Sequence, residues 1–310
     1  MIVCCGYVNV DLSVRVPRLP SDGARVQATA MERQAGGMAA NAAAAAAAFG
    51  AEVAFVGTVG DDPDGRWLVD DLADRGIDVT GVASDRRTTH CLVLVAPDGQ
   101  RAIISEDDHL RPADLRSAYD RAAATAGVLY LDGYRWPAAA TVLNAGGSRP
   151  VIVSDLDGCE SLDGLHAAAR TVDHLLCSRS HFAQLVGTPA AEDVARVLAR
   201  DAGTAVVLTD GARGWWAVAG GQERSGAALP VEAVDTTGAG DAFCGAYLAE
   251  IERGAGVFDA ARAANAAAAL STTGAGARDR LARREEIDAL LSEAGRGLRL
   301  DDQEPREARP

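Results

Sequence analysis

The sequence lacks the glycine-rich signatures of two large classes of nucleotide-binding protein. Its first apolar run, Ile2–Cys5, is followed by Gly6 alone and not by G-x-G-x-x-G. No G-x-x-x-x-G-K-[ST] occurs either. The first absence argues against an NAD-dependent oxidoreductase with a dinucleotide fingerprint, and the second excludes a P-loop kinase.

Paired cysteines, a leader and a long apolar run are missing too. None of the six cysteines forms C-x-x-C, and no histidine lies at metal-ligand spacing from them, so we expect reduced, buried thiols. Met1 leads straight into an apolar run without a basic segment. The alanine tract Ala42–Ala48 is too short to span a bilayer. These features predict a cytoplasmic protein with no membrane partner.

Positive charge is in short supply. Lys and Arg number 30 against 44 Asp and Glu, which gives a net charge of -14 and argues against nucleic acid or an anionic membrane as a partner. Phosphate ligands stay open, because backbone N–H groups can bind them. With 310 residues, 48% of them hydrophobic, the chain can form one large α/β domain with a small appendage.

Short apolar runs alternate with helix-like segments along the chain, which predicts a doubly wound, mostly parallel sheet with helices on both faces. The expected strands are Ile2–Cys5, Val53–Val56, Gly127–Leu131, Val151–Val153, His174–Cys177, Ala205–Leu208 and Gly214–Val218. The expected helices are Met38–Phe49, Gly65–Arg75, Pro112–Ala124, Trp136–Ala145, Leu162–Arg170 and Ala191–Ala202.

Four other segments alternate apolar and polar residues with period two, which predicts a small β-sheet lid with one solvated face. They are Leu12–Val16, Ala24–Glu32, Thr88–Ala96 and Gln100–Ile104, the last two joined by a hairpin turn at Pro97-Asp98-Gly99. The predicted lid covers 12–32 and 88–104, and the main domain covers 1–11, 33–87 and 105–295. The charged, Pro-containing residues 296–310 predict a disordered tail.

The segment Asp235-Thr236-Thr237-Gly238-Ala239-Gly240-Asp241 carries the chemistry. A turn of small residues feeds an apolar helix, so unpaired N–H groups and the positive end of the helix dipole form an anion hole at Gly238, Ala239 and Gly240. Asp241 beside that hole could accept a proton from an attacking hydroxyl. The competing interpretation is that Asp241 is only a helix N-cap.

The run D-T-T-G-A-G-D-A-F-x-G-A resembles the signature of the ribokinase family, also called the PfkB carbohydrate kinases. Similar blocks follow the family order in Gly36–Asn41, Val56–Gly65, Asn265–Leu270 and Gly274–Ala277. The resemblance spans residues 1 to about 290 and implies a ribokinase-like fold and an ATP-dependent sugar kinase. The alternative of another class is a non-catalytic sugar- or nucleotide-binding regulator, which would be expected to lose the base or its anion hole.

The resemblance implies roles for particular residues. Asp241 is the catalytic base, and Gly238, Ala239 and Gly240 form the anion hole. The cofactors are ATP and Mg²⁺, with K⁺ near the Asp235 loop and Gly276 as a candidate activator. Thr209, Gly211 and Gly214 bind the nucleotide, and Asn265 lies beside the adenine; an ordinary turn and a helix-surface amide are the competing interpretations.

On the substrate side the resemblance implies that Asp11, Gly37 and Asn41 bind the sugar. The competing interpretations are a turn aspartate, a turn glycine and a helix N-terminal amide. It further implies a homodimer formed through the lid, whose exposed strand edges invite pairing.

Two departures from the family pattern bear on the metal and the sugar. Where many relatives carry Asn-x-x-Glu, the chain reads Ser178-Arg179-Ser180-His181, so the metal ligands are unknown, with Asp155 or Asp157 as candidates. Met38 stands where ribokinase-like relatives often have Lys.

Arg135 follows a strand and offers a fork of donors suited to an anion, an arrangement similar to that of sulfofructose kinases. A ketose with an anionic end group, such as sulfofructose, is therefore one predicted substrate. The alternatives are another ribokinase-like sugar, a sugar acid such as 2-keto-3-deoxygluconate, or a nucleoside. The competing interpretation of Arg135 is a surface salt bridge.

Overall fold

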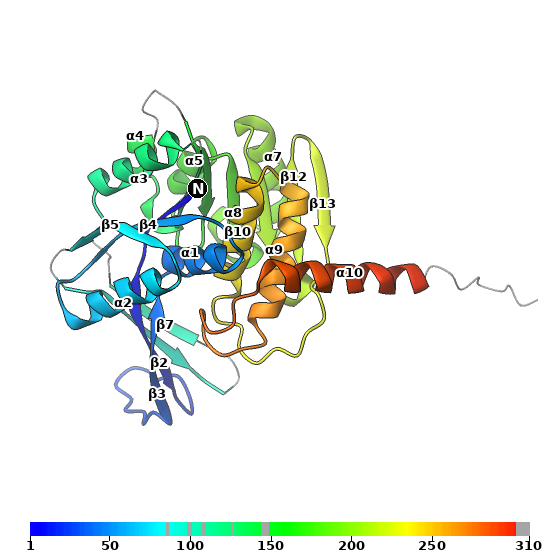
Figure 1. Ribbon diagram of the computed structural model, residues 1–310. Coiled ribbons are helices and arrows are strands. Elements are labelled where there is room, and N and C mark those ends of the chain that lie inside the picture. Colours follow the sequence, from blue (N-terminus) through cyan, green and yellow to red (C-terminus); the bar gives the residue numbers. More distant parts are fainter. Residues whose placement is uncertain (85–86, 98–100, 107–109, 126, 144–148, 302–310) are drawn as a thin grey trace, which may run out of the picture.

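The computed structural model describes residues 1–301 apart from 85–86, 98–100, 107–109, 126 and 144–148, and these residues form two sheets (Figure 1). The larger sheet has nine strands in the order β13-β12-β11-β10-β9-β8-β1-β4-β5, parallel except where β12 pairs with β11 and β13. Its strands are β1 (Ile2–Cys5), β4 (Val53–Val59), β5 (Asp78–Ser84), β8 (Val128–Leu131), β9 (Val151–Asp155), β10 (His174–Ser178), β11 (Ala205–Thr209), β12 (Trp215–Ala219) and β13 (Gln222–Gly226).

Helices cover both faces of this sheet because successive strand residues point into two separate cores. In β1, Ile2 and Cys4 enter one core, while Val3 and Cys5 enter the other. The first core is closed by α1 (Met38–Ala48), α2 (Pro63–Asp74), α8 (Ala239–Glu252), α9 (Val257–Ser271) and α10 (Arg284–Asp301). The second is closed by α3 (Pro112–Ala124), α4 (Ala138–Leu143), α5 (Leu162–Ala169), α6 (Arg179–Val186) and α7 (Ala191–Ala202).

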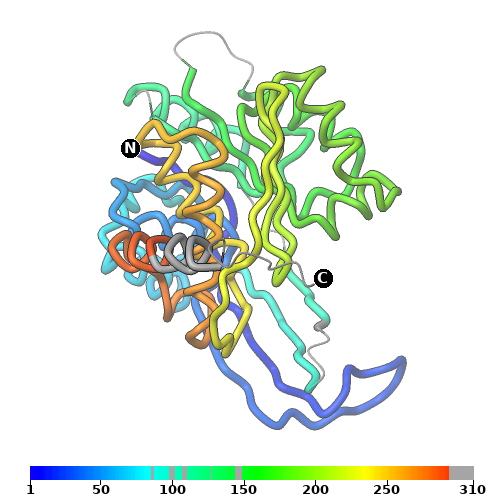
Figure 2. Tube along the Cα trace, turned by 90° about the vertical axis from the view of Figure 1, so that its right-hand side faces the viewer, coloured from blue at the N-terminus to red at the C-terminus, as the bar shows by residue number. Residues whose placement is uncertain are grey.

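The smaller sheet forms an arm that reaches away from the main body (Figure 2). Its order is β3-β2-β6-β7, from β2 (Asn9–Arg15), β3 (Ala30–Gly36), β6 (His90–Val95) and β7 (Arg101–Ser105). Because Asn9 pairs with Gly36, the strands extend beyond the predicted lid bounds on the side of the main domain, and Asp11 lies inside the small sheet. The predicted turn at Pro97-Asp98-Gly99 reaches residues outside the described part of the chain.

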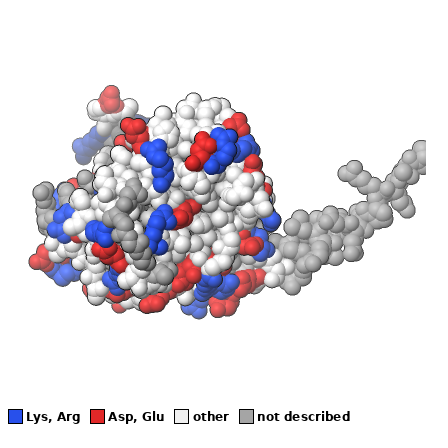
Figure 3. All heavy atoms as spheres, turned by 90° about the horizontal axis from the view of Figure 1, so that it is seen from above, with Lys and Arg blue, Asp and Glu red and all other residues white. Residues whose placement is uncertain are grey.

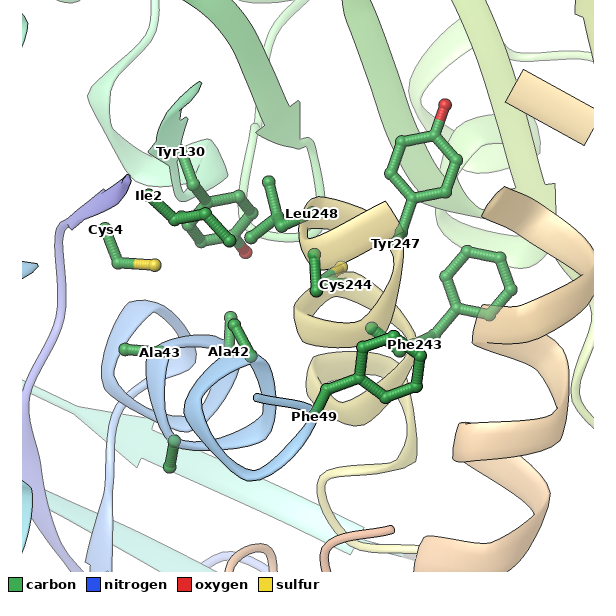
Figure 4. Close-up of a cluster of buried hydrophobic side chains, with 14 of the residues drawn as sticks. Ile2, Cys4, Ala42, Ala43, Phe49, Tyr130, Phe243, Cys244, Tyr247 and Leu248 are labelled. Carbon is green, nitrogen blue, oxygen red and sulfur yellow. The ribbon is translucent and has the colours of Figure 1, made fainter. Parts of the chain in front are cut away.

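Two alanine-rich helices bring distant parts of the chain together. Helix α1 packs against α8 with very small side chains between the two backbones, and Ala42, Ala43, Phe243 and Cys244 lie in this region (Figure 4). Gly245 of α8 permits this approach, because a Cβ atom there would lie 2.5 Å from the Ala42 carbonyl oxygen. The close packing fixes the beginning of α1 beside the beginning of α8.

Strands β5 and β13 and helices α6 and α10 were not predicted, and one prediction is corrected. Strands β5 and β13 lie at the two edges of the large sheet and are largely unburied, so they lack an apolar run, and the short helix α6 was also missed. Regular structure was expected to end after Gly295, but α10 continues to Asp301. The rest of the predicted tail, 302–310, lies outside the described residues.

The charge distribution and the helix lengths bear on the excluded partners. On the face shown in Figure 3, acidic and basic side chains are interspersed and do not gather into a positive patch. Within the described residues, no helix is both long enough and apolar enough to cross a bilayer.

Candidate active site

The site is built around the loop that leads into α8. Gly238 has φ 74°, a left-handed conformation that glycine adopts without strain. A Cβ atom on Gly238 would lie 2.6 Å from that of Ala277, so the loop also needs glycine for space. Among the described residues, the N–H groups of Gly240 and Asp241 have no hydrogen-bond acceptor, and nothing lies within 4 Å of a Cβ placed on Gly240. The helix therefore presents open amides to a cleft, as an anion hole requires.

Asp241 lies on the first turn of α8 beside these amides. Burial raises the pKa of its carboxyl to about 7, and the charges of Asp11 and Asp157 act in the same direction. A hydrogen bond from Asn41 and the charge of Arg278 oppose the rise. Its side chain caps no backbone N–H of α8, so the N-cap interpretation is wrong. A carboxylate with a pKa near the operating pH suits general-base catalysis.

Asn41 connects this carboxylate to an arginine that sequence reasoning missed. Asn41 Nδ2 donates to Asp241 Oδ2 over 2.8 Å, while Arg278 Nε donates to Asn41 Oδ1 over 2.6 Å. Arg278 comes from the loop between α9 and α10, and its side chain is only 3% exposed. The prediction for Asn41 was sugar binding; the structure places its amide between the two charged groups. No sequence signal marked Arg278, because its partners lie far away along the chain.

The four residues predicted for the nucleotide line one cavity of about 480 Å³ together with Ala239 and Gly240. Thr209 ends β11, Gly211 and Gly214 follow in the loop before β12, and Asn265 comes from α9. Asn265 is buried and donates from Nδ2 to the Ala227 carbonyl over 2.9 Å, so it is not a helix-surface amide. The remaining lining is mostly apolar: Ala212, Ala228, Leu229, Pro230, Val231, Ala233, Thr236, Phe243, Ala268, Ala269 and Thr272. Such a cavity, with few polar groups, suits a flat heterocycle.

Asp11 and Gly37 come from the small sheet and from the beginning of α1. Asp11 Oδ1 accepts a hydrogen bond of 2.6 Å from Asn9, and burial raises the pKa of Asp11. Gly37, the N-cap of α1, has φ 101°, and a Cβ atom there would lie 2.4 Å from the Tyr7 carbonyl oxygen. Asp11 lies within β2, so the competing interpretation as a turn aspartate is wrong. Gly37 lies directly before the first residue of α1. Their predicted role in sugar binding stays a prediction.

Arg135 differs from the sequence expectation. Its side chain is only 11% exposed, and its Nε lies 3.8 Å from Oδ1 of the fully buried Asp132. Its guanidinium carbon also lies 5.0 Å from the centre of the Tyr7 ring. The salt bridge of the competing interpretation is present, but it is not at the surface. Asp132 already balances the charge of Arg135, which weakens its attraction for a ligand anion.

Asp155 and Asp157 are the two carboxyls that the sequence offered as candidate metal ligands. Burial raises the pKa of Asp155 well above its usual range, and the Asp157 charge adds to this; Asp155 Oδ2 accepts a hydrogen bond from Cys244 over 3.1 Å. Asp157 Oδ1 accepts from the Ser178 N–H and hydroxyl over 3.1 and 3.0 Å. Within the described residues, no cluster of three or more His, Cys, Asp or Glu could hold a metal ion. Asp155 and Asp157 therefore stay predictions as metal ligands.

Comparisons with known proteins agree with this geometry. The model of the pfkB family carbohydrate kinases matches residues 1–283. Ribokinase of Bacillus subtilis is 29% identical over 94% of this chain and 99% of its own length. Fructokinase of Klebsiella pneumoniae is 32% identical over 83% and 91%. The structure of Arabidopsis thaliana ribokinase complexed with ribose and ATP superimposes with a TM-score of 0.75 at 25% identity, covering 94% of this chain and 98% of that one.

The chain belongs to the pfkB family of carbohydrate kinases. It is an ATP-dependent sugar kinase with a ribokinase-like fold, as the sequence motifs predicted. The rival assignments, an oxidoreductase and a non-catalytic regulator, are thereby set aside.

Proposed function

We propose that the chain transfers the γ-phosphoryl group of ATP to a hydroxyl of a small sugar, with Asp241 as the base. The observation that supports this most directly is the position of Asp241: it lies beside the open amides of α8, directly after Ala239 and Gly240 of the apolar cavity, and close enough to Asp11 for that charge to raise its pKa. ATP would place its adenine in the cavity and its γ-phosphate at the amides. The acceptor hydroxyl would lie between that phosphate and Asp241.

The residues then divide the work. Asp241 takes the proton from the hydroxyl, while the N–H groups of Gly240 and Asp241 stabilise the charge that develops on the phosphoryl oxygens. Bound Mg²⁺ would supply further neutralisation of the phosphates, with Asp157 as the protein carboxylate nearest to this task. Asp11 would orient the sugar by accepting hydrogen bonds from its hydroxyls.

An ADP-release assay with neutral sugars, sugar acids, sulfosugars and nucleosides tests the proposal. Asp241→Asn should keep binding ATP and sugar but lose about 10²–10⁴ in kcat, the usual contribution of a positioned base. Near-normal turnover of this variant would refute the role of Asp241.

The finer proposal concerns a ketose with an anionic end group, such as sulfofructose, and it depends on Arg135. The largely buried guanidinium just beyond the carboxyl end of β8 favours it, whereas the salt bridge with Asp132 opposes it. Arg135→Met should reduce kcat/KM for sulfofructose more than for fructose and ribose. Equal loss for charged and neutral sugars would leave one of the alternatives, a neutral sugar, a sugar acid or a nucleoside.

A potassium site near Asp235 and Gly276 is also proposed from the family resemblance. The Asp235 carboxylate accepts hydrogen bonds from Thr237 N–H over 2.9 Å and from Gly276 N–H over 3.0 Å, so it joins the two loops that would surround the ion. Activity in potassium compared with tetramethylammonium at equal ionic strength would test the site.

The lid is proposed to form a homodimer. Both edge strands of the small sheet carry exposed large apolar side chains: Met31 is 67% exposed, and Ile103 and Ile104 are each 63% exposed. Light scattering should give twice the monomer mass, and Ile104→Glu should reduce it. A monomeric mass for the unmodified chain would exclude the dimer.

A further inference from the structure

Arg278 uses its whole guanidinium on three acceptors from three separate elements. Nε donates to Asn41 Oδ1 over 2.6 Å, Nη1 to Asp71 Oδ2 over 2.6 Å, and Nη2 to the Gly36 carbonyl over 2.7 Å. Asn41 lies on α1, Asp71 on α2, and Gly36 ends β3 of the small sheet. Because the guanidinium is planar and rigid, three such bonds fix its orientation.

This orientation determines which way the Asn41 amide points. Arginine has only donors, so the amide oxygen must face Arg278. A carboxylate has only acceptors, so the amide nitrogen must face Asp241. The reversed amide would place N–H against N–H on one side and oxygen against oxygen on the other. Arg278 therefore makes Asn41 a donor toward Asp241.

The donation leaves Asp241 with one oxygen held and one available. Its Oδ2 accepts from Asn41, whereas Oδ1 has no hydrogen bond to any residue that the structure describes. An ionised Asp241 matches the Asn41 donor, and the positive charge of Arg278 behind the amide favours that ionised form.

We propose that Arg278 is a positioning residue for phosphoryl transfer: it sets the Asn41 amide, which holds one oxygen of Asp241 and directs the other to the acceptor hydroxyl. The proposal rests on the role of Asp241 as the base. The charges of Asp11 on β2 and of Asp157 just beyond β9 oppose the ionisation of Asp241, and the ionised Asp241 in turn raises the pKa of Asp155 at the end of β9.

The pH profile of Arg278→Met is the decisive measurement. Without the cation and the ordered amide, Asp241 should ionise only at higher pH. The acidic limb of kcat should move up by about one pH unit, which is about a fivefold loss at pH 7 and about a tenfold loss at lower pH, with recovery toward the original rate at alkaline pH. The KM for ATP should not change, because Arg278 does not line the nucleotide cavity.

Arg75→Met is the matched control. Arg75 also forms a salt bridge with Asp71, at 3.0 Å, but its hydrogen bonds go to Asp71 and to the Arg278 carbonyl and not to Asn41. This variant should lose the salt bridge between residue 75 and Asp71 but keep the pH profile of the unmodified enzyme. If both variants shift the profile equally, the effect belongs to the charge around Asp71 and the proposal is overturned.

Chemical rescue provides a second readout. Arg278 lines a hollow of about 410 Å³ with Trp67 and Gln34, so a small cation can reach the vacated position. Low millimolar guanidinium should restore kcat of Arg278→Ala several-fold at neutral pH, but should not restore Asp241→Asn. Absence of rescue, together with a kcat loss that is the same at every pH, would show a purely structural role and overturn the proposal.

The outcomes also separate this proposal from the proposed function. If the unmodified chain phosphorylates no sugar, or Asp241→Asn stays active, the function itself fails. If the unmodified chain is active and Asp241→Asn is not, the Arg278 variants decide the inference alone. Should Arg278→Met not fold, Arg278→Lys carries the same test, because lysine keeps the charge but cannot make all three bonds; its profile should lie between those of the other two chains, and an unshifted profile with wild-type kcat would count against the proposal.

Discussion

Gly245 of α8 lies directly against the Ala42 carbonyl of α1, where a Cβ atom would approach the oxygen to 2.5 Å. Ala42 follows Asn41, and Gly245 lies one turn after Asp241 on its helix. This tight contact is thus one residue from Asn41 and one helical turn from Asp241. The separation of these helices sets the 2.8 Å hydrogen bond between Asn41 and Asp241.

A larger residue at position 245 should therefore reduce both stability and activity. Gly245→Val must push the helices apart, at a cost of about 1–3 kcal/mol in the free energy of unfolding. Thermal melting and kcat measured together check this. Gly256→Ala is the control, because nothing lies within 4 Å of a Cβ placed there. A loss of stability without any loss of kcat would contradict the link between helix spacing and the site.

The pH dependence of the unmodified enzyme follows from Asp241. Since burial raises the pKa of Asp241 to about 7, the carboxyl is protonated and inactive as a base below that pH. We expect kcat to fall about tenfold per pH unit on the acidic side of pH 7 and to level off above it. A kcat that is flat down to pH 5 would contradict the raised pKa.

The ionised carboxylate of Asp241 should destabilise the folded protein. Its pKa is raised from 3.8 in an ordinary environment to about 7, so the native state binds this proton more tightly than the unfolded chain does. The stabilisation that comes from this bound proton is present at low pH and is lost as pH rises through the folded pKa. Asp241→Asn should therefore be more stable than the unmodified chain by about 1–3 kcal/mol above pH 7.

That gain should shrink toward pH 4, because the pH then approaches the unfolded pKa of 3.8 and the two states differ less in the protons they have released. Denaturant unfolding at pH 4.5 and pH 8 would measure it. A difference between the two chains that does not vary with pH would show that the ionisation of Asp241 is not responsible.

Cys91 offers a probe of the sugar site. It pairs with Asp11 in the small sheet and is half-buried, whereas the other five cysteines are buried. Burial, with the Asp11 charge, raises the pKa of its thiol to about 11, so a maleimide should label it slowly and alone near neutral pH. A bound sugar should slow the labelling, as intact mass spectrometry would show. Protection by ATP but not by sugar would move the sugar site away from Asp11.

Much of the fold could be predicted because apolar runs and turn residues report local structure. Helix α3 has the predicted bounds, Pro112–Ala124, since Pro112 can begin a helix and its apolar residues repeat at helical spacing. Strand β5 could not be predicted this way, because Gly81 and alternating polar residues hide an edge strand. Small-sheet bounds shifted because pairing partners, and not local pattern, decide where β2 and β3 end.

The candidate site could be predicted only where residues adjacent in sequence act together. Gly238, Ala239, Gly240 and Asp241 form one turn, so their arrangement follows from local geometry. Arg278 and Asn41 are 237 residues apart in the sequence, and the residues next to Arg278 in the sequence do not indicate that the two side chains meet. Arg135 was expected to face a ligand, but its burial against Asp132 depends on tertiary packing.

The alanine-rich contact between α1 and α8 limits how this enzyme can be redesigned. Any side chain enlarged along that contact would disturb the distance on which proton removal depends, so laboratory evolution toward a new sugar should find few tolerated changes there. The strands of the small sheet, which lie partly open to water, impose no such limit. Altered sugar preference should therefore be sought in those strands, with the two helices left as they are.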